Sequence, residues 1–229
     1  MSHNHASSVR ASKQEIVLIR HGQSTANASG VWQGQLEFPL SKRGRRQAAE
    51  TGRALRGVEI SGVYSSPLSR AFETAGIIAR EAGFSGEVVP MPGLMERHGG
   101  VLQGKTWAEQ EANNPEFVKK FLALPEEERW AFANAETDEE ILARFEEAIS
   151  EILSRHPSSD GLIIAVSHGG VMRAFLRDCF GPSVLPGTDR TPNASITRLI
   201  YAPDAAPQLL ELASTNHLPQ EETQQTRAK

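Results

Sequence analysis

The sequence predicts an α/β fold, a three-layer α/β/α sandwich around a mostly parallel central sheet. Two continuous apolar runs, residues 16–19 and 162–166, are typical of strands that are buried on both faces of a sheet. Segments with helical periodicity separate the strand-like runs, and the longest covers residues 138–155. Strands that alternate with helices indicate a mostly parallel sheet with helices on both faces.

The first half of the chain is predicted to alternate helices with short strands. A helix over residues 41–55 is stopped by Gly57, and short strands are expected over 62–65 and 87–91. The helix between these two strands is expected to begin at Ser66-Pro67, an N-cap followed by proline in the first turn, and to end near Gly83.

The second half begins with a charged, broken helical region over residues 106–130. Two tryptophans of this region, Trp107 and Trp130, either pack in the core or line a substrate pocket. After the long apolar strand, a helix is expected over 170–179. Two strand-like runs close the fold, and they cover residues 195–201 and 208–212.

The chain is predicted to form a single domain over residues 15–217. Residues 1–14 are small and polar and residues 218–229 are rich in Gln, Glu and Thr, so both are expected to be disordered tails. His3 and His5 lie in the first tail, and the sequence leaves open whether they bind metal.

Composition excludes several classes of function for these 229 residues. The formal net charge of −4 disfavours general binding to nucleic acid. The sequence contains no run of eighteen apolar residues, so a membrane span is not expected. The single cysteine, Cys179, forms neither an internal disulfide nor a multi-thiolate metal site, which favours a reducing, cytoplasmic compartment. The oligomeric state stays open, a homodimer included.

Polar side chains follow the predicted strands at the edge where parallel strands end and where ligands bind in such sheets. The first strand leads to Arg20 and His21, the second to Arg70, and the long apolar strand to His168; Glu96 follows the strand over 87–91. Arginine forks and imidazoles at one place indicate an anionic ligand such as phosphate. Histidine can be a covalent nucleophile, and a carboxyl group can protonate a leaving oxygen.

Five segments carry a resemblance to a known family. Residues 20–27 read RHGQSTAN and resemble the RHGx(S/T)xxN signature of the histidine phosphatase superfamily, the phosphoglycerate mutase-like proteins. Further segments resemble the family in the same order: PLSKRGRRQA over 39–48, SSPLSRA over 65–71, LMERHGGVLQG over 94–104 and SHGG over 167–170. Together the five segments are highly specific, and they imply a phosphoglycerate mutase-like fold.

The resemblance also implies roles for individual residues. His21 would attack phosphorus and become phosphohistidine, and Arg20, Arg70 and His168 would hold the phosphoryl oxygens. Glu96 would protonate the leaving alcohol and then help to activate water; Asp178 and Asp189 are alternative acids by position only. The remaining expected substrate-binding residues are Ser24, Asn27 and Gly169. The resemblance implies no metal and no cofactor. It implies that the protein binds a small phosphorylated substrate or inorganic phosphate.

Two activities compete within this family. The segment Glu96-Arg97-His98 resembles that of the glycolytic mutases, but Gly99 stands where those have tyrosine, and their longer basic insertion is missing. The shorter, acidic stretch here indicates a more open pocket that admits water, so a metal-independent phosphomonoester phosphatase is favoured over a cofactor-dependent phosphoglycerate mutase. A catalytically silent phosphate-binding regulatory protein is the third hypothesis.

Overall fold

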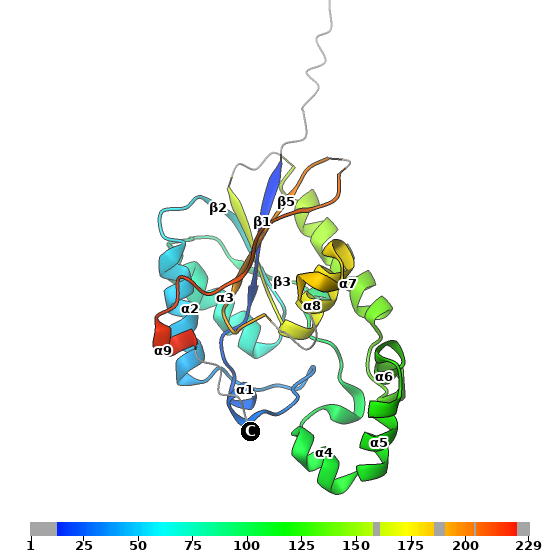
Figure 1. Ribbon diagram of the computed structural model, residues 1–229. Coiled ribbons are helices and arrows are strands. Elements are labelled where there is room, and N and C mark those ends of the chain that lie inside the picture. Colours follow the sequence, from blue (N-terminus) through cyan, green and yellow to red (C-terminus); the bar gives the residue numbers. More distant parts are fainter. Residues whose placement is uncertain (1–12, 158–160, 186–190, 204, 224–229) are drawn as a thin grey trace, which may run out of the picture.

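The computed structural model describes residues 13–157, 161–185, 191–203 and 205–223. Within them, six strands form one sheet in the order β3-β2-β4-β1-β5-β6 (Figure 1). The strands are β1 (Gln14–Arg20), β2 (Ile60–Ser65), β3 (Val88–Pro90), β4 (Leu162–Ser167), β5 (Ile196–Tyr201) and β6 (Gln208–Ser214). Strands β1 to β4 run parallel, whereas β5 is antiparallel to both of its neighbours. The predicted mostly parallel sheet is confirmed.

Helices cover both faces of the sheet because β1 alternates its side chains between them. Val17 and Ile19 face α2 (Lys42–Ala54) and α3 (Ser69–Ala82) in one buried cluster. Ile16 and Leu18 face α7 (Asp138–Ser154) and α8 (Gly169–Phe180) in the other. The three-layer sandwich therefore follows directly from the strand pattern.

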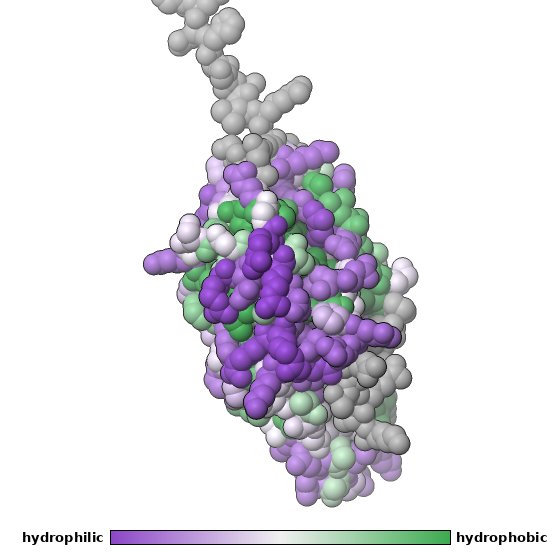
Figure 2. Space-filling view, turned by 90° about the vertical axis from the view of Figure 1, so that its left-hand side faces the viewer, coloured by the Kyte–Doolittle hydropathy of each residue, from purple (hydrophilic) through white to green (hydrophobic). Residues whose placement is uncertain are grey.

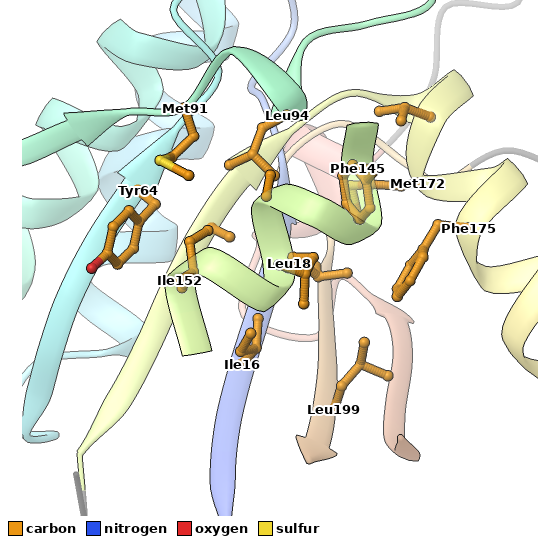
Figure 3. Close-up of a cluster of buried hydrophobic side chains, with 14 of the residues drawn as sticks. Ile16, Leu18, Tyr64, Met91, Leu94, Phe145, Ile152, Met172, Phe175 and Leu199 are labelled. Carbon is orange, nitrogen blue, oxygen red and sulfur yellow. The ribbon is translucent and has the colours of Figure 1, made fainter. Parts of the chain in front are cut away.

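The α7 side of the core is built from large apolar side chains that meet above the strands (Figure 3). Phe145 of α7 packs against Phe175 of α8, with ring centroids 4.9 Å apart. Leu18, Ile152 and Met172 are fully buried around them. Because α7 and α8 share this cluster, α7 is fixed relative to the strand β4 that precedes α8.

One predicted helix start is wrong. Helix α3 begins at Ser69, with Leu68 as its N-cap, rather than at Ser66-Pro67. The Ser66 N–H still donates to Val166 of β4, at 2.9 Å, and its hydroxyl lies 2.7 Å from His168. Ser66 therefore continues the strand edge and contacts a histidine, so the chain turns into the helix two residues later than expected.

The broken helical region after β3 contains short elements with a small core of their own. These elements are η1 (Pro92–Leu94), η2 (Gly100–Leu102), α4 (Trp107–Asn113), α5 (Pro115–Ala123) and α6 (Glu126–Phe132). Leu102 and Phe121 are buried at the centre of this core, and Trp32, Trp107 and Trp130 pack around them. Both tryptophans named by the sequence are thus packing residues.

The tail predicted from residue 218 is wrong for residues 218–223, which belong to the fold. Leu218 is buried, and α9 (Gln220–Thr223) packs onto α2 through Glu222. The Glu222 carboxylate pairs with Arg46 at 2.6 Å and with Arg43 at 3.3 Å. Figure 2 views this side of the molecule and shows a broad hydrophilic band across it. At the other end, disorder was predicted for residues 1–14, but β1 already begins at Gln14. Residues 1–12 and 224–229 lie outside the described residues, and so does the question of metal at His3 and His5.

The remaining elements are short. Helix α1 (Thr25–Ser29) follows the first strand, and η3 (Pro182–Val184) follows α8. In the part of the chain that the structure describes, no helix is long and apolar enough to cross a membrane.

Candidate active site

The two histidines named by the sequence meet at the carboxyl ends of neighbouring strands. His21 follows β1 and His168 follows β4, and these strands pair in parallel register. The His21 N–H donates to the Ser167 carbonyl at 2.9 Å, and the two imidazole rings lie 5.0 Å apart at an angle of 59°. Both side chains are buried. Strand pairing alone therefore brings together two residues that are 147 positions apart along the chain (168 − 21).

The His21 ring is oriented by its own backbone neighbour. Its Nδ1 lies 2.6 Å from the carbonyl oxygen of Gly22, which can only accept a hydrogen bond, so Nδ1 carries the proton. Burial, together with the charges of Arg70 and Arg20, lowers the pKa of His21 well below its usual value of 6.5. The ring is therefore neutral near pH 7, and the lone pair is on Nε2.

Arg70 is a fully buried cation at the start of α3. Its Nη1 donates to the Leu36 carbonyl at 2.9 Å and its Nη2 to the Gly34 carbonyl at 2.7 Å. Among the described residues, no acceptor lies within hydrogen-bond distance of its Nε. A buried guanidinium with a donor to spare is a site for an anion, because an uncompensated buried charge is costly.

Arg20 and His168 complete the set of donors. The Nη1 of Arg20 donates to the Thr191 carbonyl at 2.5 Å. The His168 Nε2 lies 2.7 Å from the Ser66 hydroxyl, whereas its buried Nδ1 has no hydrogen-bond partner within the described part of the chain. Burial, then the charges of Arg70, His21 and Arg20, lowers the pKa of His168 well below 6.5.

Glu96 lies against the N-terminus of α8, directly after His168. Its carboxylate accepts hydrogen bonds from the N–H groups of Arg97 at 2.8 Å, Gly170 at 3.0 Å and Val171 at 3.0 Å. The first turn of a helix offers such free N–H groups and a positive dipole end. Glu96 is also near enough to Arg70 to act on its pKa, although burial, which lowers that pKa, is the larger effect.

Two glycines make room for these side chains. A Cβ at Gly169 would lie 3.1 Å from the guanidinium carbon of Arg20, and a Cβ at Gly170 would lie 2.5 Å from the Glu96 carboxylate. The sequence suggested Gly169 as a substrate-binding residue. The structure gives both glycines a further role, since the pair of them lets an arginine and an acid approach the first turn of α8.

Ser24 and Asn27, also predicted to bind substrate, form the capping box of α1. The Asn27 N–H donates to Ser24 Oγ at 3.0 Å, and the Ser24 N–H donates to Asn27 Oδ1 at 3.1 Å. Asn193, which the sequence did not single out, donates through Nδ2 to Asn27 Oδ1 and to the His21 carbonyl. These bonds fix the loop after β1, and a direct contact of Ser24 or Asn27 with substrate stays a prediction.

The alternative acids do not join this group. Asp178 lies two residues before the C-terminal end of α8, whereas His168 caps its N-terminus, so the rise of the helix separates them by roughly 15 Å. Asp189 lies outside the described residues. Of the two named acids that the structure describes, Glu96 is therefore the one that lies beside the buried cations.

Comparisons with known proteins identify the family of the chain. The chain matches the histidine phosphatase superfamily (branch 1) over residues 16–215. It is 38% identical, over 73% of its length and 69% of the relative's, to a metal-independent phosphoserine phosphatase of Arabidopsis thaliana. It is 32% identical to a probable phosphoglycerate mutase of Erwinia tasmaniensis, over 81% and 84% of the two chains.

A solved structure shares the fold as well. A mycobacterial glucosyl-3-phosphoglycerate phosphatase, solved with VO3, superimposes with a TM-score of 0.72 at 28% identity, over 86% of this chain and 97% of that one. The chain therefore belongs to the histidine phosphatase superfamily and has its phosphoglycerate mutase-like fold. Within that superfamily it is a phosphatase-type enzyme, a phosphoric monoester hydrolase.

Proposed function

We propose that this enzyme hydrolyses a small phosphomonoester through a phosphohistidine at His21, without a metal ion. One observation carries the proposal: neutral His21 lies among buried cationic and N–H donors, two atoms of which, Arg70 Nε and His168 Nδ1, lack a partner among the described residues. A phosphoryl group supplies the oxygens that such donors bind.

In the first half-reaction, the lone pair of His21 Nε2 attacks phosphorus, and the bond from phosphorus to the alcohol oxygen breaks. Glu96, in its protonated form, gives its proton to that oxygen, so the alcohol leaves neutral. Arg20, Arg70 and His168 stabilise the charge on the three equatorial oxygens. Lowering the pKa of His21 by burial keeps the attacking lone pair free near neutral pH.

In the second half-reaction, the Glu96 carboxylate takes a proton from water as the water oxygen attacks phosphorus. The nitrogen–phosphorus bond breaks, its electron pair returns to His21 Nε2, and inorganic phosphate leaves. Glu96 is then protonated again and the cycle closes. The same carboxyl group acts as acid and as base, which requires that it stays in one place between the two steps.

Trapping the intermediate tests this proposal. Acid-free quenching with ³²P-labelled substrate is expected to give a label on His21 that is stable to base and lost in acid, in the presence of EDTA. His21→Ala is expected to lower turnover by about 10⁴-fold or more, as removal of a nucleophile does in other covalent enzymes. Unlabelled enzyme during turnover, unchanged activity in His21→Ala, or inactivation by EDTA would each contradict the mechanism.

The substrate and the competing mutase activity are tested together. The names of the relatives suggest phosphoserine and glucosyl-3-phosphoglycerate as the first substrates to assay. The probable mutase among the relatives makes 3-phosphoglycerate the necessary third. Release of inorganic phosphate supports the phosphatase, whereas efficient conversion to 2-phosphoglycerate with a bisphosphorylated primer identifies a mutase.

A further inference from the structure

The loop that carries Glu96 is bound by one arginine from a distant helix. Arg144, on α7, donates through Nη1 to the carbonyls of Gly93 at 2.9 Å and Met95 at 2.7 Å. Its Nη2 donates to the carbonyl of Glu96 itself at 3.1 Å. Three carbonyls of a four-residue segment thus accept hydrogen bonds from a single guanidinium, and one of them belongs to the acid.

Glu136 holds this guanidinium in place. The Arg144 Nε donates to Glu136 Oε1 and Nη2 to Oε2, both at 2.9 Å, which is the paired geometry that arginine and a carboxylate favour. The same Oε2 accepts the His98 N–H at 2.6 Å, so Glu136 also fixes the loop on the far side of Glu96. Residues 93–98 are therefore bound at both ends by one ion pair.

A third side chain binds the middle of the loop. Gln35 donates through Nε2 to the Glu96 carbonyl at 3.0 Å and to Glu136 Oε2 at 3.3 Å. At the start of the loop, a Cβ on Gly93 would lie only 2.3 Å from the Arg144 carbonyl oxygen, so the loop backbone packs directly onto α7. The backbone of Glu96 is thus located by α7, while its carboxylate is located by α8.

The Arg144–Glu136 pair is partly buried. The exposed fractions of the two side chains are 22% and 23%, so solvent screens this pair less than it screens a surface pair. Burial acts to raise the pKa of Glu136, but the hydrogen bonds from Arg144 and His98 and the charges of Arg144 and Arg97 outweigh it and leave the pKa below its usual range. Glu136 is therefore ionised at neutral pH and stays paired.

We propose that Arg144, held by Glu136, is a positioning residue that sets the place of the Glu96 carboxyl group for proton transfer to the leaving alcohol. The inference rests on the proposed function, because it gives Arg144 a purpose only if Glu96 is the acid. Arg144 does not touch the phosphoryl group in this account. It acts through the backbone of Glu96, and its charge adds only the smallest of the effects that lower the pKa of His168.

This role has a kinetic signature that a merely structural role lacks. A poor leaving group, such as an alkoxide, needs a proton as its bond to phosphorus breaks, whereas p-nitrophenolate leaves without one. Displacing the acid therefore slows alkyl phosphates much more than aryl phosphates. The ratio kcat/KM reports the first half-reaction only, so it isolates this proton transfer from the later attack of water.

The experiment compares kcat/KM for p-nitrophenyl phosphate, phenyl phosphate and an alkyl phosphate in a set of variants. Glu96→Gln defines the full effect of losing the acid. Arg144→Met is expected to lower kcat/KM for the alkyl phosphate by about 10- to 100-fold and to change that for p-nitrophenyl phosphate by less than about threefold. Arg155→Met, which removes an exposed pair with Glu151 from the same helix, is the matched control and is expected to change neither.

A double variant separates positioning from general damage. In the Glu96→Gln background, Arg144→Met is expected to have no further effect on the leaving-group dependence, because the two residues act through one group. An equal loss for all three substrates, a loss that persists in the Glu96→Gln background, or no loss would each overturn the inference. If Arg144→Met does not fold, Arg144→Lys and Glu136→Gln replace it; each leaves a polar group in place and is expected to give a smaller loss with the same dependence.

Failure of this inference is distinguishable from failure of the proposed function. If wild-type enzyme yields no label on His21, the proposed function is wrong, whatever Arg144→Met does. If the label forms and Glu96→Gln shows the leaving-group dependence while Arg144→Met does not, only the role of Arg144 is wrong.

Discussion

The groups that would attack phosphorus or bind its oxygens are held in place differently from the acid that would protonate the leaving group. His21, Arg70 and Arg20 donate to backbone carbonyls, those of Gly22, of Gly34 and Leu36, and of Thr191. We call these three donors and His168 the phosphate cradle. The loop over residues 93–98, by contrast, is bound by the side chains of Arg144, Glu136 and Gln35.

Because of this difference, a single substitution is expected to alter the two regions to different degrees. A backbone carbonyl remains whatever residue carries it, so the orientation of His21, Arg70 and Arg20 resists substitution of their neighbours; His168, which contacts the Ser66 hydroxyl, is the exception. The carboxylate of Glu96 accepts backbone N–H groups, but the backbone of its loop depends on three side chains, each of which a single mutation removes. The geometry of proton transfer is therefore expected to be the more adjustable part of the site, and the binding of phosphate the more constant part.

The largest effect is expected from the phosphate cradle itself. Arg70→Met removes a buried cation with its hydrogen bonds and is expected to lower kcat/KM by about 10³-fold, as loss of a transition-state donor does elsewhere. Arg70→Met removes a cation that would stabilise the phosphoryl oxygens and leaves Glu96 in place. The loss in kcat/KM should therefore be alike for alkyl and aryl phosphates. Steady-state kinetics with both substrates measure it, with Arg80→Met at the exposed end of the same helix as control. A loss confined to alkyl phosphates would mean that Arg70 serves proton transfer as the Glu96 loop does, which would contradict the distinction between the phosphate cradle and that loop.

A pair of glycine variants sharpens the comparison within one helical turn. Gly170→Ala puts a methyl group 2.5 Å from the Glu96 carboxylate, and a loss of about 10- to 100-fold is expected for alkyl phosphates. Gly169→Ala meets the Arg20 guanidinium at 3.1 Å, so a smaller loss, equal for alkyl and aryl phosphates, is expected. Alanine favours the helix over glycine, which offsets part of the cost of these close approaches, and the melting temperature checks that both variants fold. Equal kinetic profiles for the two variants would contradict the assignment.

The buried histidines predict a dependence of stability on pH. Burial, with the nearby arginines, lowers the pKa of both His21 and His168 in the folded protein, so below pH 6.5 the unfolded chain binds protons that the folded chain does not. The free energy of unfolding should therefore fall as the pH drops below 6.5, by up to about 1.4 kcal/mol, or tenfold in the folding constant, per pH unit for each histidine.

Urea unfolding at pH 7.5, 6.5 and 5.5 measures this dependence. The double variant His21→Gln, His168→Gln serves as the reference and should show a smaller loss of stability on acidification. Equal slopes for wild type and double variant would mean that these rings are not held neutral in the fold.

The smallest effect on turnover is expected outside both regions, at α9. Glu222→Gln weakens the pairs with Arg43 and Arg46 and should reduce the free energy of unfolding by about 1 kcal/mol. Turnover should stay within about twofold, because Glu222 contacts neither the phosphate cradle nor the Glu96 loop. Chemical denaturation and kinetics measure the two quantities, with exposed Glu221→Gln as control. A tenfold loss of turnover would show that α9 acts on the site.

Much of the fold and of the site is predictable from the sequence because local patterns carry it. The apolar runs locate β1 and β4, and the residue after each of these strands is one of the two histidines. Arg20, Arg70 and Glu96 also follow from their segments, and the structure brings all five side chains to one edge of the sheet. Their catalytic roles stay predictions until the variants are measured.

Other features depend on contacts that no local pattern encodes. The start of α3 was predicted too early because Ser66 is typical of an N-cap, yet its hydroxyl lies against His168, which is 102 residues away. Burial of Glu222 depends on Arg43 and Arg46, far back in the chain. In the sequence, Arg144 and Glu136 are two charged residues in and just before a predicted helix. Only the folded chain shows that they bind the Glu96 loop.

The place of β1 in the sheet has a consequence for how the chain folds during synthesis. β1 pairs with β4 on one side and β5 on the other, both of which follow more than 140 residues later. During synthesis, the segment that carries His21 must wait for residues 162–167 to leave the ribosome before it gains its first partner, and for residues 196–201 before it gains the second. Folding dominated by such non-local pairing is slow, because long loops must close first. A nascent chain that ends before β4 therefore holds His21 without His168, so the candidate site is completed only late in synthesis.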